Sequence, residues 1–221
     1  MREHISFSEL KTWNECAYKH KLSYIDEVKK FIGNEYTAFG KAIHDTCEQS
    51  LIAEGAVNQK NFFDKKFIKE IEELVESGLD LNSKLLKDMR QQAPEILKHV
   101  LPELKNHFES YEVISTEEKI YEPMKEVDYN FKGFIDLVIK TPDGMYHVID
   151  WKTCSWGWDM RKKADPMVTY QLTYYKHFLA KKHKIDLKNI ETYFILLKRV
   201  AKKNRVEIFK VTSGAKKTEN C

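Results

Sequence analysis

Asp136, Asp150 and Lys152 have the residue types and the spacing that binding of a hard cation requires. If a β-hairpin sets the two aspartates opposite each other, their like charges destabilise the sheet unless a cation lies between them. A divalent ion with oxygen ligands is the natural partner of two such carboxylates. Lys152, one pleat beyond Asp150, would then hold or polarise a water beside the ion. A surface hairpin with scattered charges is the alternative interpretation of this short pattern taken alone.

The hairpin itself is predicted by the segments 131–140 and 145–152, which are rich in aromatic and β-branched residues and flank a Pro-Asp-Gly sequence. Pro and Asp favour a type I turn, and Gly144 can take the left-handed conformation that closes it with a bulge. With a three-residue loop, Thr141 pairs with Met145. This register places the two aspartates opposite each other and turns the tryptophan between Asp and Lys to the other face.

The composition is that of an ordinary globular protein. Of 221 residues, 32% are charged and 42% hydrophobic, and the net charge is +3, so one domain with a sizeable core is expected. A nucleic-acid partner would therefore need local basic patches. No apolar run approaches the ~20 residues of a membrane span, the N-terminus lacks a signal-peptide core, and the cysteines lack zinc-site or disulfide-framework spacing. We expect a reduced, cytoplasmic protein with no membrane partner.

An amphipathic helix is predicted over 36–53, and it carries His44. His44 lies one turn after Gly40 and one turn before Glu48, so the three share a face. The glycine removes a side chain where another backbone can approach. A structural histidine is the commoner role for an isolated helical His, and a metal ligand is the alternative.

A second helix, predicted over 165–182, places Gln171 and Tyr175 four residues apart on one face. Its start is marked by an Asp cap followed by proline. Gln and Tyr near two carboxylates suggest a hydrogen-bonding role. On the strand before the hairpin, Glu118 is a candidate for an additional acid in the same cleft, with Glu117 as its rival.

The remaining elements predict a mixed α/β fold. Ser8 would cap a first helix within 5–24, and Pro94 and Pro102 should start, kink or end helices in a region that is helical throughout 58–111. Further strands are expected over 113–124, 190–197 and 205–211. We interpret 1–221 as a single domain, 56–111 as a helical insertion within it, and 213–221 as a disordered tail.

Aromatic and basic residues after the hairpin are candidates for contacts with nucleobases and phosphates. The alternatives are tryptophans packed on the core and solvated turns. The candidates are Trp156, Trp158, Arg161, Lys162, Lys163, Lys198 and Arg199.

Four short motifs occur in order along the chain: FGKAIH (Gly40, His44), GFID (Gly133, Asp136), IDWK (Asp150, Lys152) and QLTYY (Gln171, Tyr175). Their order and predicted secondary structure resemble the PD-(D/E)xK nuclease superfamily, in particular its RecB-like branch, which also contains CRISPR-adaptation nucleases and phage exonucleases. The resemblance covers about residues 5–211. It implies a restriction-endonuclease-like core, in which a central mixed β-sheet is flanked by helices.

The resemblance also implies roles for these residues. His44, Asp136, Asp150 and the Trp151 carbonyl would bind Mg²⁺ or Mn²⁺, Lys152 would position the attacking water, and Gln171 and Tyr175 would orient the site. Some relatives bind an iron–sulfur cluster through one early and three late cysteines. Here only Cys221 follows Gln171, so a cluster with the usual four thiolates is not expected.

The function expected from this resemblance is a Mg/Mn-dependent deoxyribonuclease, an exonuclease acting in DNA recombination, repair or phage DNA processing. Single-stranded DNA or duplex ends would be its substrates, and a helicase or recombination partner is compatible with the branch. If the protein is phage-encoded, it would act in the host cytoplasm. The alternatives are a catalytically silent DNA-binding module with the same fold and an inert scaffold.

Overall fold

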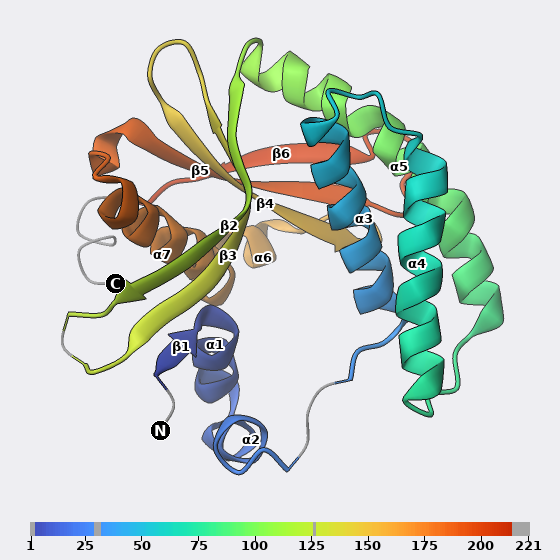
Figure 1. Ribbon diagram of the computed structural model, residues 1–221, viewed down its shortest axis with the longest axis horizontal. Coiled ribbons are helices and arrows are strands. Elements are labelled where there is room, and N and C mark those ends of the chain that lie inside the picture. Colours follow the sequence, from blue (N-terminus) through green and yellow to red (C-terminus); the bar gives the residue numbers. More distant parts are fainter. Residues whose placement is uncertain (1–2, 29–31, 126, 214–221) are drawn as a thin grey trace.

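The chain forms a six-stranded mixed sheet with helices on both faces (Figure 1). The computed structural model describes residues 3–28, 32–125 and 127–213. The sheet order is β1-β3-β4-β5-β6, and β2 pairs with β3 off this path. The β1–β3 and β4–β5 pairs are parallel and the others antiparallel, which confirms the predicted fold class. The strands are β1 (His4–Ser6), β2 (Glu112–Pro123), β3 (Asn130–Lys140), β4 (Tyr146–Cys154), β5 (Ile190–Lys198) and β6 (Val206–Val211).

The β3–β4 hairpin has the predicted turn and register. Gly144 takes φ +86°, its N–H donates to the Thr141 carbonyl at 2.9 Å, and the Thr141 N–H donates to the Met145 carbonyl at 3.0 Å. Four cross-strand pairs follow, ending at Leu137 with Ile149. The two aspartates would be the next pair, but the pairing of β3 with β4 ends before them. There β3 continues with β1 and β2 while β4 continues with β5, so the sheet forks (Figure 1).

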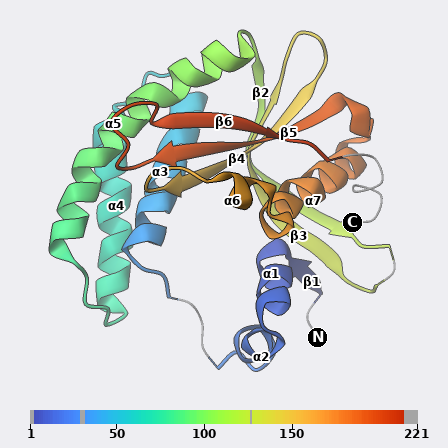
Figure 2. The ribbon, with the colours of Figure 1, turned by 180° about the vertical axis from the view of Figure 1, so that it is seen from behind.

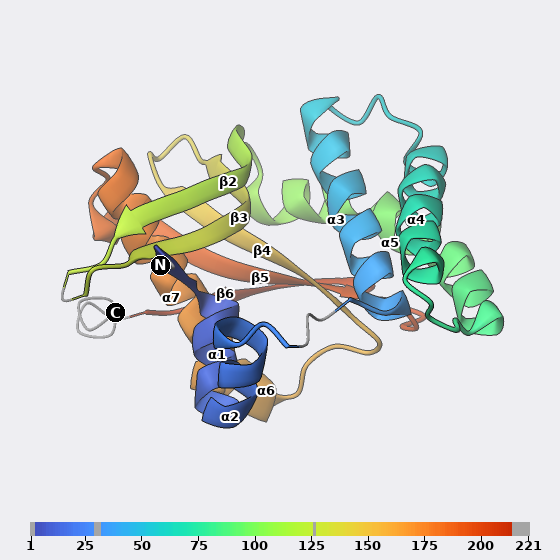
Figure 3. The same cartoon turned by 60° about the horizontal axis from the view of Figure 1, so that its bottom comes forward.

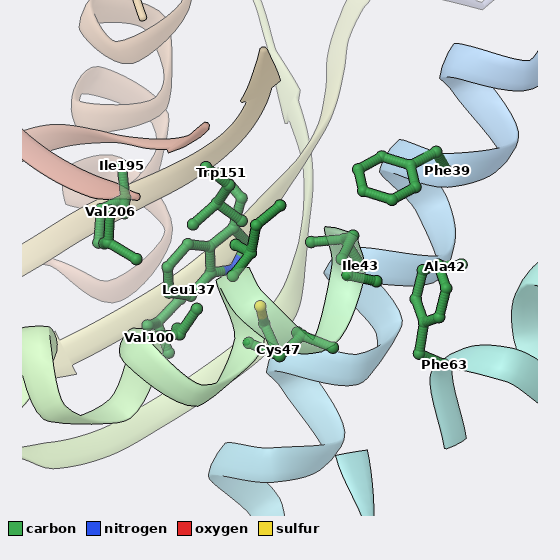
Figure 4. Packing of buried hydrophobic residues seen from close by; sticks show 14 of the residues in the cluster. Phe39, Ala42, Ile43, Cys47, Phe63, Val100, Leu137, Trp151, Ile195 and Val206 are labelled. Atoms are coloured by element: carbon green, nitrogen blue, oxygen red, sulfur yellow. The ribbon is translucent and has the colours of Figure 1, made fainter. Parts of the chain in front are cut away.

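Helices α3 (Glu35–Ile52) and α5 (Ser83–Phe108) cover one face of the sheet, and α4 (Gln59–Glu76) packs against these two helices (Figure 3). Between them and the strands lies a buried apolar cluster in which Trp151, Leu137 and Ile195 from the sheet face Ile43 and Cys47 of α3 (Figure 4). Trp151 is 1% exposed. Truncating such a ring to Ala typically costs about 3–5 kcal/mol, so this cluster anchors β4 against α3.

Helix α5 runs unbroken through Pro94 and Pro102. Neither proline starts or ends a helix, so of the three predicted outcomes only a kink remains. Ala93, Leu97 and Leu104 of the same helix are buried in the apolar cluster, and this burial outweighs the roughly 3 kcal/mol that an interior proline costs. The predicted helical stretch does break at residues 77–82, between α4 and α5.

The opposite face is covered by α7 (Pro166–His183) and α1 (Phe7–Glu15), as the view from behind shows (Figure 2). Phe131 of β3 stacks on Tyr174 and Phe178 of α7 at centroid distances of 5.2 and 4.5 Å. The short helix α6 (Met160–Ala164) leads into α7, and the 3₁₀ turn Leu187–Asn189 leads from α7 to β5. The parallel β4–β5 pair thus has the helical crossover that it requires.

The predicted first helix is divided. Helix α1 is capped by Ser6, whose Oγ accepts a hydrogen bond from the Glu9 N–H at 3.2 Å, and not by Ser8. Extended backbone at Cys16 separates α1 from α2 (Ala17–His20), and a π-helical turn, Lys21–Ile25, follows. Residues 214–221 of the predicted tail lie outside the described residues. No helix in the described part of the chain is long and apolar enough to cross a membrane.

Candidate active site

Asp136 lies where the sheet forks. Its Oδ2 accepts a hydrogen bond from the Trp151 N–H at 2.7 Å. In an unbroken antiparallel ladder, each N–H group that points towards the neighbouring strand donates a hydrogen bond to a carbonyl of that strand. At the fork a carboxylate of β3 serves this β4 donor instead, which holds the Asp136 side chain against the backbone between Asp150 and Lys152.

Asp150 is almost fully buried at 2% exposure, and α7 supplies a donor to it. Gln171 Nε2 donates to Asp150 Oδ1 at 3.0 Å and also contacts Tyr175 Oη at 3.1 Å. Lys152 Nζ forms an ion pair with Asp150 Oδ2 at 2.6 Å, and no other described group lies within hydrogen-bonding reach of this oxygen. The buried carboxylate therefore keeps an oxygen that can accept a further ligand.

Gly133 gives Tyr175 its place beside β3. A Cβ at residue 133 would lie 2.8 Å from Tyr175 Cε1 and 3.2 Å from Phe131 Cε1. The first distance is a steric clash with a buried ring, so the glycine is required for the close packing of α7 on this part of the strand.

His44 reaches the fork from α3. Its Nδ1 lies 3.7 Å from Asp136 Oδ2. A Cβ at Gly40, one turn earlier, would lie 3.1 Å from Thr153 Oγ1. The missing side chain lets α3 approach the end of β4, as the helical spacing of these residues predicts.

Burial dominates the electrostatics of the site. It raises the pKa of Asp136 to about 6 and of Asp150 to about 6, and in both cases the positive charge of Lys152 opposes part of the rise. Burial lowers the pKa of His44 to about 4. Near neutral pH, the site thus combines a neutral imidazole with two carboxylates whose ionised forms are disfavoured unless more positive charge is near.

The donor set suits a hard divalent cation. The buried Asp150 carboxylate, the partly buried Asp136 carboxylate and a neutral imidazole gather around the Trp151 backbone. No three His, Cys, Asp or Glu side chains of the described residues already form a group that could hold an ion. Asp136 is hydrogen-bonded to a backbone N–H and Asp150 is ion-paired with Lys152, so ligation would require these side chains to turn.

Glu118 does not share this cleft, which corrects our expectation. Its carboxylate pairs with Lys182 at 2.6 Å and with His183 at 2.8 Å, near the end of α7. Glu117 has the left-handed φ of +48° and lies beside the fork, where its charge and that of Glu48 act to raise the pKa of Asp136. Simple alternation along a strand could not identify Glu117, because this positive φ interrupts the alternation. The position of Glu48, one turn after His44 on the same helix face, does indicate that it lies near the site.

The residues proposed to contact nucleic acid divide into two groups. Lys198 and Arg199 are each 8% exposed. Five of the seven side chains have internal partners: Lys163 and Lys198 pair with Glu207, Arg199 donates to Gln92, Trp158 packs on Phe194 and Phe209, and Lys162 Nζ lies 4.6 Å from the centre of the Trp158 ring. These contacts would have to break or be shared before the same atoms could bind phosphate or base, and the DNA contacts stay predictions. Trp156, Arg161 and Lys162 are exposed.

Comparison with known proteins agrees with this fold. Residues 4–219 match the family model of the PD-(D/E)XK nuclease superfamily. A crystal structure from Eubacterium rectale named "Putative exonuclease" matches with a TM-score of 0.64 and 14% identity, over 99% of this chain and 75% of that chain. The crystal structure of SSO0001 matches with a TM-score of 0.37 and 13% identity, over 96% of this chain and 82% of that chain. No curated protein matches.

Because the family model spans almost the whole chain, the protein belongs to the PD-(D/E)XK nuclease superfamily. Members of this superfamily are phosphodiester hydrolases that generally use divalent metal ions such as Mg²⁺. The roles of individual residues in this chain remain predictions.

Proposed function

We propose that this protein is a Mg²⁺- or Mn²⁺-dependent deoxyribonuclease, an exonuclease of the RecB-like branch that acts in DNA recombination, repair or phage DNA processing. The observation that carries the proposal is the fork, where the buried Asp150 and the partly buried Asp136, both with raised pKa values, gather beside Lys152 in a chain of this superfamily. The order of the GxxxH, GxxD, DxK and QxxxY motifs supports the branch, and the name of the Eubacterium rectale protein supports exonuclease action.

His44, Asp136, Asp150 and the Trp151 carbonyl would hold the cation. When bound, a divalent ion supplies positive charge to the scissile phosphate and makes water more acidic. Binding of the cation would require the ion pair between Asp150 and Lys152 to open, so that the Asp150 carboxylate could become a metal ligand. Lys152 Nζ would then be released to orient the attacking water and to stabilise the negative charge that builds on the phosphate.

Gln171 and Tyr175 act on the position of Asp150. The Gln171 amide holds Asp150 Oδ1, and the Tyr175 hydroxyl lies next to that amide. Burial and the charge of Asp150 raise the pKa of Tyr175, so its hydroxyl stays protonated at neutral pH. Gln171 is therefore a neutral donor to the carboxylate, and Tyr175 Oη accepts from the same amide, so the pair orients Asp150 without neutralising it.

The test is cleavage of end-labelled linear single- and double-stranded DNA beside a closed circle, with Mg²⁺, Mn²⁺ or EDTA. We expect metal-dependent loss of linear DNA, and a decrease of about 10²–10³-fold in Lys152→Ala. Lys140→Ala, a change in the same hairpin beside its turn, is the matched control and should cleave normally. Wild-type rates in Lys152→Ala would refute the assignment. Salt-dependent DNA binding without cleavage in either metal would favour a DNA-binding module.

A further inference from the structure

Three segments meet beyond the end of β4, on the side of the sheet where α3 begins (Figure 3). The β5–β6 turn is joined to the loop after β4 by two backbone hydrogen bonds, from Arg199 N to Cys154 O at 2.8 Å and from Val200 N to Ser155 O at 3.0 Å. The Arg199 guanidinium lies 5.6 Å from the Tyr36 ring of α3. These contacts bring α3, the β4–α6 loop and the β5–β6 turn to one place.

Two aromatic side chains at this place are open to solvent. Trp156 in the β4–α6 loop is 71% exposed, and Tyr36 in the first turn of α3 is 54% exposed. The neighbouring Trp158 shows the alternative for this loop, since it packs on Phe194 and Phe209. Leaving a tryptophan in water forgoes the large burial gain of its ring, so Trp156 offers an open stacking face.

The same place carries positive charge that is not neutralised internally. Lys202 and Lys203 in the β5–β6 turn are exposed, and neither has an ion-pair partner within the part of the chain that the structure describes. Lys198 at the base of the turn is different, because it is buried and paired with Glu207. The turn therefore has a paired, structural base and an unpaired, exposed tip. We call Tyr36, Trp156, Lys202 and Lys203 the aromatic–basic surface.

We infer that the aromatic–basic surface binds the single-stranded segment of DNA next to the bond that is cleaved, an inference that rests on the proposed nuclease function. Bases can stack on aromatic side chains only where they are unpaired, and lysines beside them neutralise the backbone. Trp156 is four residues beyond Lys152, a span of at most about 14 Å. A strand whose phosphate reaches Lys152 would therefore have its next nucleotides at this surface. The substrate is accordingly single-stranded DNA or a duplex end with an overhang.

The first test measures binding in EDTA by fluorescence anisotropy, with a labelled single-stranded 20-mer and a blunt duplex of the same sequence. Trp156→Ala should weaken single-strand binding by about 5- to 100-fold and change blunt-duplex binding by less than about twofold. Trp156→Phe should restore most of the affinity, because it keeps a stacking ring. Tyr121→Ala, an exposed aromatic on β2, is the matched control and should bind like wild type.

The second test isolates the charge. The Lys202→Ala/Lys203→Ala double variant should reduce the slope of log K against log salt for the single strand by about 1.4, which is two released counterions. The Lys84→Ala/Lys87→Ala double variant removes the same charge from exposed positions of α5 and should leave the slope unchanged.

Equal losses for duplex and single strand in Trp156→Ala, or no loss for either, would overturn the inference, as would wild-type protein that does not bind the single strand. The proposed nuclease function is judged separately, by cleavage. Wild-type protein that binds through Trp156 but does not cleave refutes the nuclease and keeps the surface. Protein that cleaves single-stranded DNA with the same KM and kcat after Trp156→Ala keeps the nuclease and refutes the surface.

Discussion

Asp136→Asn should stabilise the metal-free protein at alkaline pH. Burial raises the pKa of Asp136 from 3.8 to about 6, a rise of roughly two units, and each unit corresponds to about 1.36 kcal/mol. Ionised Asp136 thus costs up to about 3 kcal/mol in the folded state. Asn removes the charge but keeps an oxygen to accept the Trp151 N–H. Because the amide remains a buried polar group, we expect a gain of about 1–3 kcal/mol.

The pH dependence of the stability gain is the most direct test of this prediction. A carboxyl group with a raised folded-state pKa stabilises the fold fully at low pH and loses that stabilisation as pH rises through about 6. The gain from Asn should therefore be absent near pH 4 and complete by about pH 7.5. The titration of His44 is common to both proteins and largely cancels in the difference.

Urea denaturation in EDTA at pH 4.5 and pH 8 measures this difference. Asp143→Asn is the control, since Asp143 lies in the exposed turn with its pKa lowered mainly by a hydrogen bond from Thr141, and Asn there should not stabilise. Excess Mg²⁺ should stabilise wild type more than Asp136→Asn, by up to about 2.7 kcal/mol at 100 times Kd. An equal gain at both pH values, or none at pH 8, would refute the assignment of buried charge at the fork.

Two further predictions concern residues around the fork. Gly133→Ala should lose about 1–3 kcal/mol of stability in urea denaturation, because its Cβ would lie 2.8 Å from Tyr175 Cε1. The double variant with Tyr175→Ala should lose clearly less free energy of unfolding than the sum of the two single variants. Full additivity would show that the tyrosine ring does not clash with the new side chain. Glu117→Gln should stabilise the metal-free protein at pH 8 by less than about 1 kcal/mol, since burial raises the pKa of this carboxyl as well. Glu118→Gln should be neutral or slightly destabilising, because it loses ion pairs with Lys182 and His183. If Glu118→Gln were the stabilising variant and Glu117→Gln the destabilising one, our placement of the two acids would be reversed.

The parts of the site that the sequence predicts are those set by local rules. The Pro-Asp-Gly turn defines one loop length, and the loop length defines the hairpin register. Helical spacing predicts that Gly40 and His44, one turn apart, share one face of α3. The same rule brings Gln171 and Tyr175 together on α7. In each case the relevant partner is a few residues away or is paired through a turn.

What the sequence does not predict depends on tertiary partners. Lys198 and Arg199 look like a basic hairpin tip, but Glu207 on the neighbouring strand and Gln92 on α5 occupy them. Lys202 and Lys203, a few residues further along the same basic turn, are exposed. No pattern within the turn distinguishes the paired residues from the unpaired ones, because the carboxylate and the amide that decide the matter lie on other elements.

The fork connects the stability of the protein to its chemistry. If β3 and β4 stayed paired, the Trp151 N–H would donate to a backbone carbonyl, and no carboxylate would be needed as its acceptor. Because the strands separate, Asp136 serves this donor, Asp150 is buried beside it, and both pKa values rise. The carboxylates are thus held in a high-energy ionised state near neutral pH, and a divalent cation would relieve it. Affinity for the ion and instability without it then have one origin, so a change that removes the instability, such as Asp136→Asn, should remove the affinity as well.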